Sequence, residues 1–413
     1  MKHTTRLAAL LLAALALASC SERKRPNDDA ETIEPAAPSV TETTSVPETV
    51  VPIQPAVPEK DDTLRFISNA GNLKLETVEM NAEDYRIHPL GEDRYLLVLF
   101  NRLRDKDGNL WLENNQSVCT NIRAVIFDAK TGEVGKAIPI GGGTVPQLIS
   151  YTEKGCILYD FVNYGNGVIQ TAAWELDLTA KNPTLKAVKF DPSKERGQSV
   201  TSPDGKWTVY RRSLDLSGDG EIVLIDEKGK EKVILEGITL EEAEKIAPKN
   251  EQEIGKVEGH SVLGFLDDER LVYNITGWEW PIGWGIYNVK TGEKTEYREG
   301  DHITTICDGK LYGTDFSYAA LDSVYRFGTD GTKTVLADKN TDILKPITSA
   351  PEIWQFGMKD GTWYGVPYIG VDSGLGNLYI CDTEVKNLLA EIGGKADQWL
   401  LCGDTVYALV RTK

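Results

Sequence analysis

The sequence has little cysteine, histidine and methionine, and these shortages bear on which sites the chain can build. It contains six cysteines, four histidines and three methionines in 413 residues. No C-x-x-C pair occurs and no histidine stands at zinc-ligand spacing, so the pattern favours neither a zinc cluster nor a disulfide framework. Most of the cysteines lie in strand-like patterns, where a thiol is usually a small buried side chain, and we expect no structural disulfide. The cysteines are Cys20, Cys119, Cys156, Cys307, Cys381 and Cys402.

Positive charge is also scarce. Lysine and arginine total 45 against 63 acidic residues, which gives a net charge of −18. Such a field repels phosphate backbones, so nucleic acid is not an expected partner. The acidity is otherwise typical of a soluble protein.

The apolar run at the N-terminus is too short to span a bilayer permanently. Lys2 and Arg6 precede the apolar stretch Leu7–Leu17, which is typical of a signal peptide. The sequence Leu17-Ala18-Ser19-Cys20 resembles the lipobox of bacterial lipoprotein signal peptides. That resemblance implies cleavage before Cys20, lipid attachment to Cys20, and an extracytoplasmic location at the cell membrane or cell envelope. The alternative is an ordinary secretory signal.

Residues 21–62 contain seven prolines and no glycine. Such a segment cannot bury a core and favours extended polyproline II structure. At about 3.1 Å per residue it reaches on the order of 100 Å. We therefore expect three parts: a lipoprotein signal peptide (1–20), a disordered linker (21–62) and a folded domain (63–413). A Pro-rich ligand for a partner domain is the alternative reading of the linker.

The stretch Ser202–Leu235 has the pattern of one propeller blade. A turn at Pro203-Asp204-Gly205 precedes a predicted strand at Lys206–Arg212. Further predicted strands follow at Glu221–Asp226 and Glu231–Leu235, and Gln198–Thr201 supplies an inner strand. Four short antiparallel strands joined by turn residues are typical of a β-propeller blade.

Two series of turn signals repeat this pattern along the chain. One joins predicted third and fourth strands, and its six members lie at 127–133, 176–181, 225–230, 287–293, 327–331 and 381–386. The other joins first and second strands, and its seven members lie at 91–94, 153–155, 203–205, 267–269, 308–310, 359–361 and 403–404. The mismatch predicts that N-terminal strands at 66–71 and 73–78 complete a blade begun by C-terminal strands at 397–402 and 405–411. We therefore predict an all-β, seven-bladed β-propeller, with six or eight blades possible, closed by its two termini.

One short helical insertion is expected inside the ring. Thr239-Leu-Glu-Glu242 has the pattern of a capping box and Pro248 ends the helix. Separately, Ser202-Pro203-Asp204-Gly205-Lys206-Trp207, followed by Thr-Val-Tyr, resembles the WD-repeat-like units of TolB-type propellers. The pattern is sharp in this blade and degraded in the other six, so it implies the fold and transfers no contact residues.

The search for catalytic motifs is negative. Gly259-His-Ser-Val-Leu263 departs from a nucleophile elbow at its last position. The three histidines after the signal peptide, His88, His260 and His302, are far apart in sequence and predict no metal site. Among 63 acidic residues no glycosidase-type carboxylate pair can be singled out. We therefore predict that the chain is not an enzyme, with a carbohydrate-active enzyme as the less favoured alternative.

A weak calcium candidate is the only cofactor signal. Asp215, Ser217 and Asp219 match the start of a calcium loop. Position 223, where a ligand would be expected in integrin-like loops, is Val223, so an ordinary Asp/Gly loop is the preferred reading. No cofactor is expected.

Aromatic residues in the predicted second-to-third-strand loops are the strongest binding signal. Clustered aromatics on loops of a rigid scaffold can anchor peptides or stack on sugars. The alternative is that these rings fold under the loops as small cores. The predicted ligand-binding residues are Trp278, Trp280, Trp284, Tyr164, Tyr318 and Tyr368, with Arg212 and Asp315 on the same side. We predict a monomeric, lipid-anchored protein- or peptide-binding scaffold, with a glycan-binding protein as the alternative.

Overall fold

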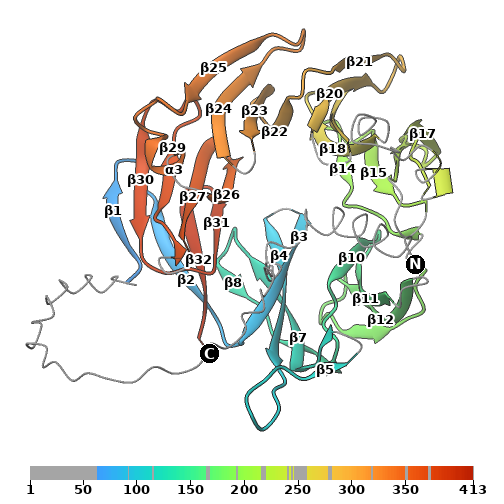
Figure 1. The fold of residues 1–413 in the computed structure, drawn as a ribbon. Helices are drawn as coiled ribbons and strands as arrows, with labels where there is room; N and C mark the ends of the chain where they lie inside the picture. The colour runs from blue at the N-terminus through green and yellow to red at the C-terminus, as the bar shows by residue number, and fades with distance from the viewer. Residues whose placement is uncertain are drawn as a thin grey trace, which may run out of the picture.

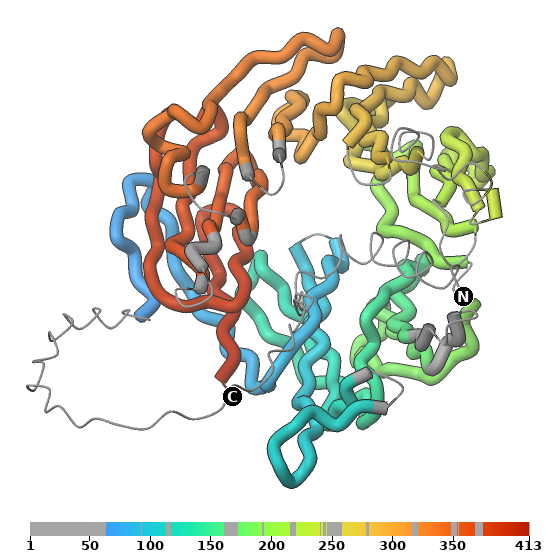
Figure 2. The backbone as a smooth tube through the Cα atoms, in the orientation of Figure 1, coloured from blue at the N-terminus to red at the C-terminus, as the bar shows by residue number. Residues whose placement is uncertain are grey.

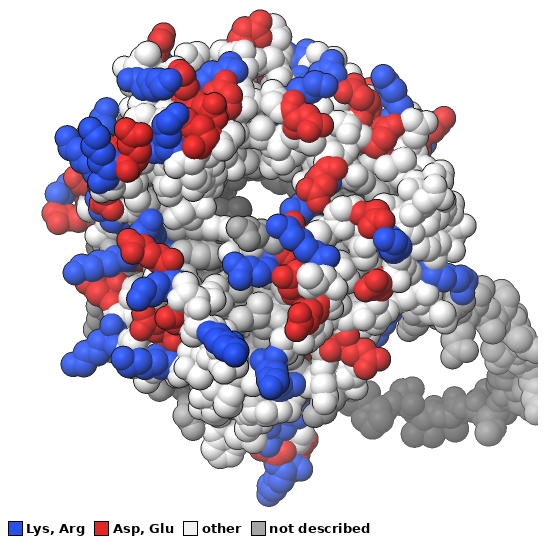
Figure 3. Space-filling view, turned by 180° about the vertical axis from the view of Figure 1, so that it is seen from behind, with Lys and Arg blue, Asp and Glu red and all other residues white. Residues whose placement is uncertain are grey.

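The computed structural model describes residues 63–412, apart from 92, 114–115, 164–167, 192–193, 215–219, 240, 243–244, 246–257, 278–280, 318–319, 349–351 and 371–373. The described chain is almost entirely β-strand and forms a ring of seven blades (Figure 1). The space-filling view shows an opening at the centre of the ring (Figure 3). The seven-bladed prediction is confirmed.

Blades 1 to 5 are each built from one continuous stretch of chain. Their strands, from the inner to the outer edge, pair antiparallel. Blade 1 has β3 (Asp84–Gly91), β4 (Arg94–Arg102), β7 (Cys119–Asp128) and β8 (Glu133–Val134), and β9 (Ile138–Gly143) also pairs with β7. Blade 2 has β10 (Leu148–Tyr151), β11 (Gly155–Asn163), β12 (Val168–Asp177) and β13 (Leu185–Ala187). Blade 3 has β14 (Val200–Thr201), β15 (Thr208–Arg212), β16 (Glu221–Ile225) and β17 (Glu231–Leu235).

The next two blades follow the same order. Blade 4 has β18 (Gly259–Phe265), β19 (Arg270–Thr276), β20 (Pro281–Asn288) and β21 (Lys294–Tyr297). Blade 5 has β22 (His302–Cys307), β23 (Lys310–Ser317), β24 (Ala320–Phe327) and β25 (Lys333–Asp338). A short helix, α3 (Lys345–Thr348), lies between blades 5 and 6 in the sequence.

Blades 6 and 7 share the N-terminal strands. Blade 6 has β26 (Glu352–Lys359), β27 (Thr362–Gly370), β29 (Leu378–Cys381) and β30 (Leu388–Gly393), with β28 (Gly374–Leu375) beside β27. On its outer edge β1 (Arg65–Asn69) adds a further strand, antiparallel to β30. Blade 7 has β31 (Gln398–Cys402), β32 (Thr405–Arg411) and β2 (Lys74–Met80). The N-terminal and C-terminal strands therefore lie side by side (Figure 2).

This closure corrects the predicted one in two respects. Only β2 joins the C-terminal strands, and it pairs with β32 in parallel, whereas we had predicted two N-terminal strands in an antiparallel blade. The predicted first strand, β1, belongs to blade 6 instead. Blade 7 therefore has three strands.

The direction of β2 follows from where the chain must go next. In a four-stranded antiparallel blade the fourth strand runs in the same direction as the second and delivers the chain to the next inner strand. β2 is followed after only three residues, 81–83, by the inner strand β3 of blade 1. It therefore runs as a fourth strand would, parallel to β32, although it occupies the third position.

The predicted turns at Asp128 and Asp226 are stabilised by hydrogen bonds from backbone amides to an aspartate side chain, and each contains a glycine. Asp128 Oδ1 accepts hydrogen bonds from the amides of Lys130 and Thr131, and Asp226 Oδ1 accepts those of Lys228 and Lys230. In both turns the glycine has a left-handed φ, 74° at Gly132 and 75° at Gly229, which side chains rarely adopt. Both series of predicted turns are found between the expected strands.

The motif Ser202–Trp207 forms the first turn of blade 3. Ser202 Oγ donates to Asp204 and accepts from the amide of Trp207, and the glycine at the corner has a φ of 75°. These bonds take Lys206 and Trp207 into the turn, so the flanking strands are shorter than predicted, at Val200–Thr201 and Thr208–Arg212.

The core lies between neighbouring blades. One cluster joins Met80 of β2 and Leu409 of β32 to Leu97 and Phe127 of blade 1. Another joins Trp399 of blade 7 to Ile380 of blade 6. The cysteines at 119, 156 and 381 are buried, and those at 307 and 402 are half-buried; all five thiols are free. The blades are thus held together by radial layers of apolar side chains.

The predicted helical insertion is described only at its start. Thr239 Oγ1 donates to Glu242 Oε2, and the amides of both residues are hydrogen-bonded to the other's side chain, which is a capping box. Further along, Lys245 binds Glu241 at 2.7 Å, and the residues from 246 to 257, including Pro248, lie outside the described residues. Among the helices of the described chain, none is long and apolar enough to cross a membrane.

Candidate functional site

The two faces of the ring carry connections of different length. On the short-turn face the first and second strands are joined by tight turns, such as 92–93 in blade 1. On the long-loop face the second strands end and the inner strands begin. The connections there include 103–118 in blade 1, 213–220 in blade 3 and 371–377 in blade 6. Long loops on a rigid scaffold are where binding residues tend to lie.

Several predicted site residues fall outside the described part of the chain. These are Tyr164, Trp278, Trp280 and Tyr318, together with the calcium candidates Asp215, Ser217 and Asp219. Tyr368 lies in β27, where its backbone pairs with Glu352 and Leu375. Its position at the end of a second strand agrees with the predicted face, and it stays a prediction as a ligand contact.

Trp284 is not a loop residue as we had predicted. It lies in β20, and only 1% of its surface is exposed. Its ring packs against Tyr297, with centroids 4.5 Å apart, and edge-on against Phe327 of blade 5, at 5.8 Å. Strand β20 begins at Pro281, so Trp284 lies inside the strand and not in the loop before it. Its ring fills the contact between blades 4 and 5.

Arg212 and Asp315 lie on the predicted face but in separate blades. Arg212 is the last residue of β15, and its guanidinium binds Glu221, with Nε 2.8 Å from Oε1, and Glu231 at 3.0 Å. The hydrogen bond to Glu221 raises the pKa of Arg212. Asp315 is exposed in β23 of blade 5. Arg212 therefore joins three strands of its own blade and does not form a site with Asp315.

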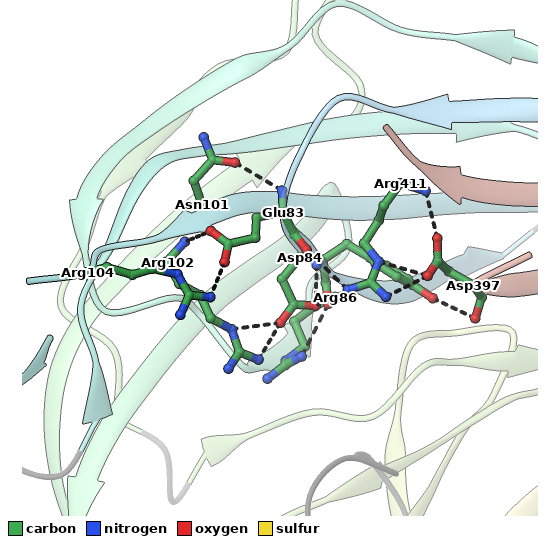
Figure 4. Close-up of polar contacts among 9 residues, drawn as sticks. Glu83, Asp84, Arg86, Asn101, Arg102, Arg104, Asp397 and Arg411 are labelled. Atoms are coloured by element: carbon green, nitrogen blue, oxygen red, sulfur yellow. Dashed lines mark hydrogen bonds and ion pairs between the residues drawn. The ribbon is translucent and has the colours of Figure 1, made fainter. Parts of the chain in front are cut away.

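The structure reveals a polar network where blades 7 and 1 meet, which the sequence analysis missed (Figure 4). Asp84 opens the inner strand of blade 1 and accepts two bonds from Arg102, at 3.2 and 2.6 Å. Asp397 precedes the inner strand of blade 7 and accepts bonds from Arg411, at 2.8 Å from Nε. Both arginines are the last residues of second strands, so the same Asp–Arg pairing occurs in two adjacent blades.

Glu83 and Arg104 extend this network toward solvent. Glu83 Oε1 accepts a bond of 2.6 Å from Arg104, and its other oxygen accepts the amide of Arg102. The hydrogen bond from Arg104 lowers the pKa of Glu83, and burial opposes this effect only in part. Arg411 Nη1 also donates to the carbonyl of Glu83, at 3.1 Å, which ties the end of blade 7 to the start of blade 1.

Two further arginines lie near this network and donate to backbone carbonyls instead. Arg86 donates to the carbonyl of Tyr85 and stands 5.7 Å from the centre of the Phe100 ring. Arg123 donates to the carbonyls of Asn81 and Asn121. We call the residues joined by these ion pairs the seam network; it comprises Glu83, Asp84 and Asp397 with Arg102, Arg104 and Arg411. Its three arginines and three carboxylates balance in charge.

The described residues of the loop after β4, 103–113 and 116–118, form a structured projection, which we call the finger. Three backbone bonds close a ring at its base: Leu103 N–H to Val118 C=O, Val118 N–H to Trp111 C=O, and Trp111 N–H to Leu103 C=O, all 2.8–2.9 Å. A small hairpin, β5 (Leu112–Glu113) with β6 (Gln116–Ser117), extends from this junction. Both backbone polar groups of Trp111 are therefore held by the scaffold.

The finger exposes three large apolar side chains. Leu103 is 38% exposed, Trp111 49% and Leu112 56%. A bridge between Arg104 and Leu110 places the cation of the seam network one rung from Trp111. The finger thus presents an aromatic ring and two leucines on the long-loop face, and Arg104 lies on the neighbouring rung, whose side chains point to the other side of the ladder. Trp111 is not among the predicted ligand-binding residues; its exposure next to Leu112, seen only in the structure, identifies it.

The three histidines of inner strands do not assemble a metal site. Burial, helped by Arg86, lowers the pKa of His88 to about 4, and burial alone lowers that of His302. His260 lies edge-on to Tyr273 of its own blade, with centroids 5.8 Å apart. In the described part of the chain no group of His, Cys, Asp and Glu is arranged to hold a metal ion.

Comparison with known proteins assigns this chain to no family. No protein-family model matches this chain. No curated protein matches it either. Among solved structures it is similar to the β-propeller domain of the Trilobed protease from Pyrococcus furiosus, at 15% identity and a TM-score of 0.37, over 74% of this chain and 84% of that one.

Two further solved structures show the range of the likeness. A putative 6-phosphogluconolactonase from Bacteroides fragilis matches at 13% identity and a TM-score of 0.37, over 75% of this chain and 84% of that one. An oligogalacturonate lyase in complex with manganese matches at 10% identity and a TM-score of 0.35, over 76% of this chain and 96% of that one.

These likenesses correct one prediction. We had predicted from the absence of catalytic motifs that the chain is not an enzyme. That exclusion is wrong as stated, because similar propellers include a protease domain, a putative lactonase and a lyase. At this low identity none of their activities is carried over to this chain.

Proposed function

We propose that this propeller is a lipid-anchored, extracytoplasmic module that binds a protein or peptide partner with its long-loop face. The observation that carries the proposal is the finger, on which Leu103, Trp111 and Leu112 are exposed on a backbone held at both ends. Tryptophan and arginine are the side chains most enriched at binding hot spots. A rigid backbone lowers the entropy lost when such a ring is covered.

The neighbouring leucines favour a protein partner over a glycan. A sugar-binding platform needs hydrogen-bonding groups around the aromatic ring, whereas Trp111 stands next to Leu103 across the junction and next to Leu112 along the chain. Leucine side chains gain free energy mainly from contact with other apolar side chains. A half-exposed tryptophan flanked by leucines therefore matches an apolar anchor of a peptide.

The anchored location rests on the sequence. Cys20 follows an apolar stretch and resembles a lipoprotein attachment site, and the Pro-rich residues 21–62 would hold the domain away from a membrane. Cys20→Ala should release the protein from the membrane fraction or leave the precursor uncleaved. Unchanged maturation and membrane retention would contradict the anchoring.

A photocrosslinking experiment in cells tests the binding face. A photoreactive amino acid replaces Lys106 on the finger or Lys310 on the short-turn face; both side chains are exposed. We expect adducts with a defined protein from position 106 and none from position 310. Adducts only from position 310, or no adduct from either, would refute the proposal. Binding on a glycan array that is lost in Trp111→Ala would favour the glycan alternative instead.

A further inference from the structure

We propose that residues 39–46 complete blade 7 as its fourth strand, alongside the outer edge of β2. The inference goes beyond the proposed function, because it concerns a docking surface on the rim of the ring and holds whether or not the finger binds a partner. It departs from the expected disordered linker, 21–62, for these residues only. Among the described residues the place is vacant, its backbone edge is open, and apolar side chains face it.

Blade 7 is one strand short. In the described chain it consists of β31, β32 and β2, whereas blades 2 to 5 have four strands each and blade 6 has gained β1 at its outer edge. β2 is therefore an edge strand at the third place, where the other blades have a strand that is paired on both sides. An edge strand presents unpaired backbone groups to which a further strand can bind.

The open edge of β2 carries a regular row of polar backbone groups. Lys74 donates its N–H, and Met80 accepts with its C=O, on the side of β32, so the even-numbered residues of β2 are bonded to that strand. Successive residues of a strand direct their backbone groups to opposite sides. Leu75, Thr77 and Glu79 therefore point their N–H and C=O groups outward, where no described residue bonds them.

Apolar side chains face the vacant place from the neighbouring blades. Val134 of β8, the fourth strand of blade 1, is 50% exposed and pairs with Phe127. Paired residues share one face of a sheet, and Phe127 packs against blade 7, so Val134 faces blade 7 as well. Phe66 of β1 packs toward blade 7 from the other side and is only half-buried. A fourth strand in blade 7 would cover both side chains.

The N-terminal part of the same chain is the occupant that the observations favour. The described chain begins at Thr63, and Leu64 lies directly against Gly394 in the connection that leads into blade 7. Residues 47–62 can extend up to about 50 Å, at about 3.3 Å per residue. That reach is about twice the length of an eight-residue strand. A tethered segment also acts at a high local concentration, which a separate partner would have to exceed.

Residues 39–46, SVTETTSV, have the composition of a strand. Five of the eight are valine or threonine, which strands favour, and none is proline. Pro38 and Pro47 bound the run, and proline cannot donate to a ladder, so pairing would end there. The other Pro-free run of this length in the linker, 27–34, begins with Asn-Asp-Asp, which strands disfavour.

Docking changes both the rim of the ring and the tether. Val40 and Val46 share one face of an extended run, and this face packs against Val134. Backbone pairing covers the edge of β2, which otherwise is a template for pairing with other chains. Residues 21–38 remain as the tether, whose reach falls from on the order of 100 Å to about 56 Å, at about 3.1 Å per residue. The domain is then held closer to a membrane than the whole linker would allow.

Hydrogen–deuterium exchange at residue resolution tests the inference on the chain from residue 21 to 413. The variant carries Thr43→Pro and Thr44→Pro together, so that one of the two removes a donor facing β2 whatever the register. In the parent we expect residues 39–46 to exchange at least about tenfold more slowly than a free peptide of the same sequence, and to lose this protection in the variant. The three outward amides of β2 should exchange at least about tenfold faster in the variant, while its inward amides stay unchanged.

Matched controls separate docking from general effects of substitution. Asp28→Pro with Asp29→Pro changes the other Pro-free run and should leave the protection of residues 39–46 as in the parent. Val134→Asp places a charge beside the vacant place and should weaken this protection. Val335→Asp, at a similarly exposed position of β25 in blade 5, should not.

Three results would overturn the inference. One is exchange of residues 39–46 at the rate of the free peptide in the parent, which would leave the edge of β2 to a strand from another protein. Another is protection that the double-proline variant keeps. The third is protection that rises with protein concentration together with a dimer in sedimentation, which would assign the strand to a second copy of the chain. Crosslinking from position 106 does not depend on residues 39–46, so the proposed function is judged separately.

Discussion

Blade 4 and blade 7 occupy equivalent places in the ring but are built in opposite ways. Blade 4 is a continuous stretch, β18 to β21, whose four strands all pair antiparallel. Blade 7 takes β31 and β32 from the C-terminus and β2 from the N-terminus, and its last pair is parallel. The first is joined by turns between neighbours in sequence, whereas the second depends on contacts between residues more than three hundred positions apart.

Charged hydrogen bonds join the blades on either side of the closure, on both faces of the ring. On the long-loop face Arg411 joins Asp397 to the carbonyl of Glu83. On the short-turn face Lys359 of blade 6 reaches over to Asp93 of blade 1, at 2.5 Å. Blade 4 is tied to blade 5 by a different device, in which buried Asn274 bonds both the N–H and the C=O of Ile303. At the closure, charged hydrogen bonds between blades thus add to the apolar core, whereas blades 4 and 5 are also joined by a buried amide.

Removing residues 63–80 should have the largest effect. The deletion takes β1 and β2 away, exposes the edge of β32 and uncovers the core cluster that contains Val78 and Met80. We expect a loss of several kcal/mol in the free energy of unfolding, or failure to fold, because two buried side chains and two strands are lost together. Urea unfolding measures it, with a chain that begins at residue 63 as the control. A deletion that unfolds like this control would show that blade 7 does not need β2.

Met80→Ala and Leu235→Ala compare the two kinds of blade at matched positions. Each is the last residue of a strand that leads into the next blade, and each is almost fully buried. Both substitutions should cost about 2–5 kcal/mol of unfolding free energy. Denaturant titration of the two variants checks this. A loss below about 1 kcal/mol for Met80→Ala alone would mean that the seam is packed more loosely than a continuous blade.

The pH dependence of stability should distinguish the contribution of the seam network from that of the contact between blades 1 and 2. His88 faces that contact, and burial together with Arg86 lowers its pKa to about 4 in the folded protein, from about 6.5. The unfolded chain therefore binds the proton more readily between these values. Stability present above pH 6.5 should fall by on the order of 3 kcal/mol as the pH drops to 4.

The seam contributes at lower pH. The pKa of Glu83 lies below its usual 4.5 because of its bond to Arg104, so its contribution is present above pH 4.5 and is lost only below it. Thermal unfolding between pH 4 and 7 of the parent and of His88→Gln measures the difference. A variant that keeps the parent's slope across this range would show that His88 is not its cause.

Arg411→Ala and Arg298→Ala should have the smallest effects. Arg298 of blade 4 binds Glu258 and Glu296 as Arg411 binds Asp397, and both arginines are partly exposed. Solvent screening limits each loss to about 0.5–1 kcal/mol. Arg411→Ala should cost the larger share because it also releases the carbonyl of Glu83. Urea unfolding in low and high salt measures both, and an equal loss that does not depend on salt would contradict the ion-pair account.

Local signals in the sequence determined the blades and their number. The Asx-type turn at Asp226, the left-handed glycine at Gly229 and the alternation in β16 and β17 all act within a few residues, so they are readable without the fold. The same local turn and strand patterns predicted the long-loop face and the capping box at Thr239. The need for the termini to complete a blade followed from counting turns.

Only the tertiary structure decided how the ring closes and which side chains lie at its surface. The parallel pairing of β2 with β32, and the pairing of β1 with blade 6, depend on partners from the other end of the chain. Trp284 is buried because Phe327 of the next blade covers it, whereas Trp111 is half exposed on a loop whose backbone is hydrogen-bonded at its base. Burial and strand partnership depend on which distant residues fold against a segment, and the pattern of the segment itself does not contain that information.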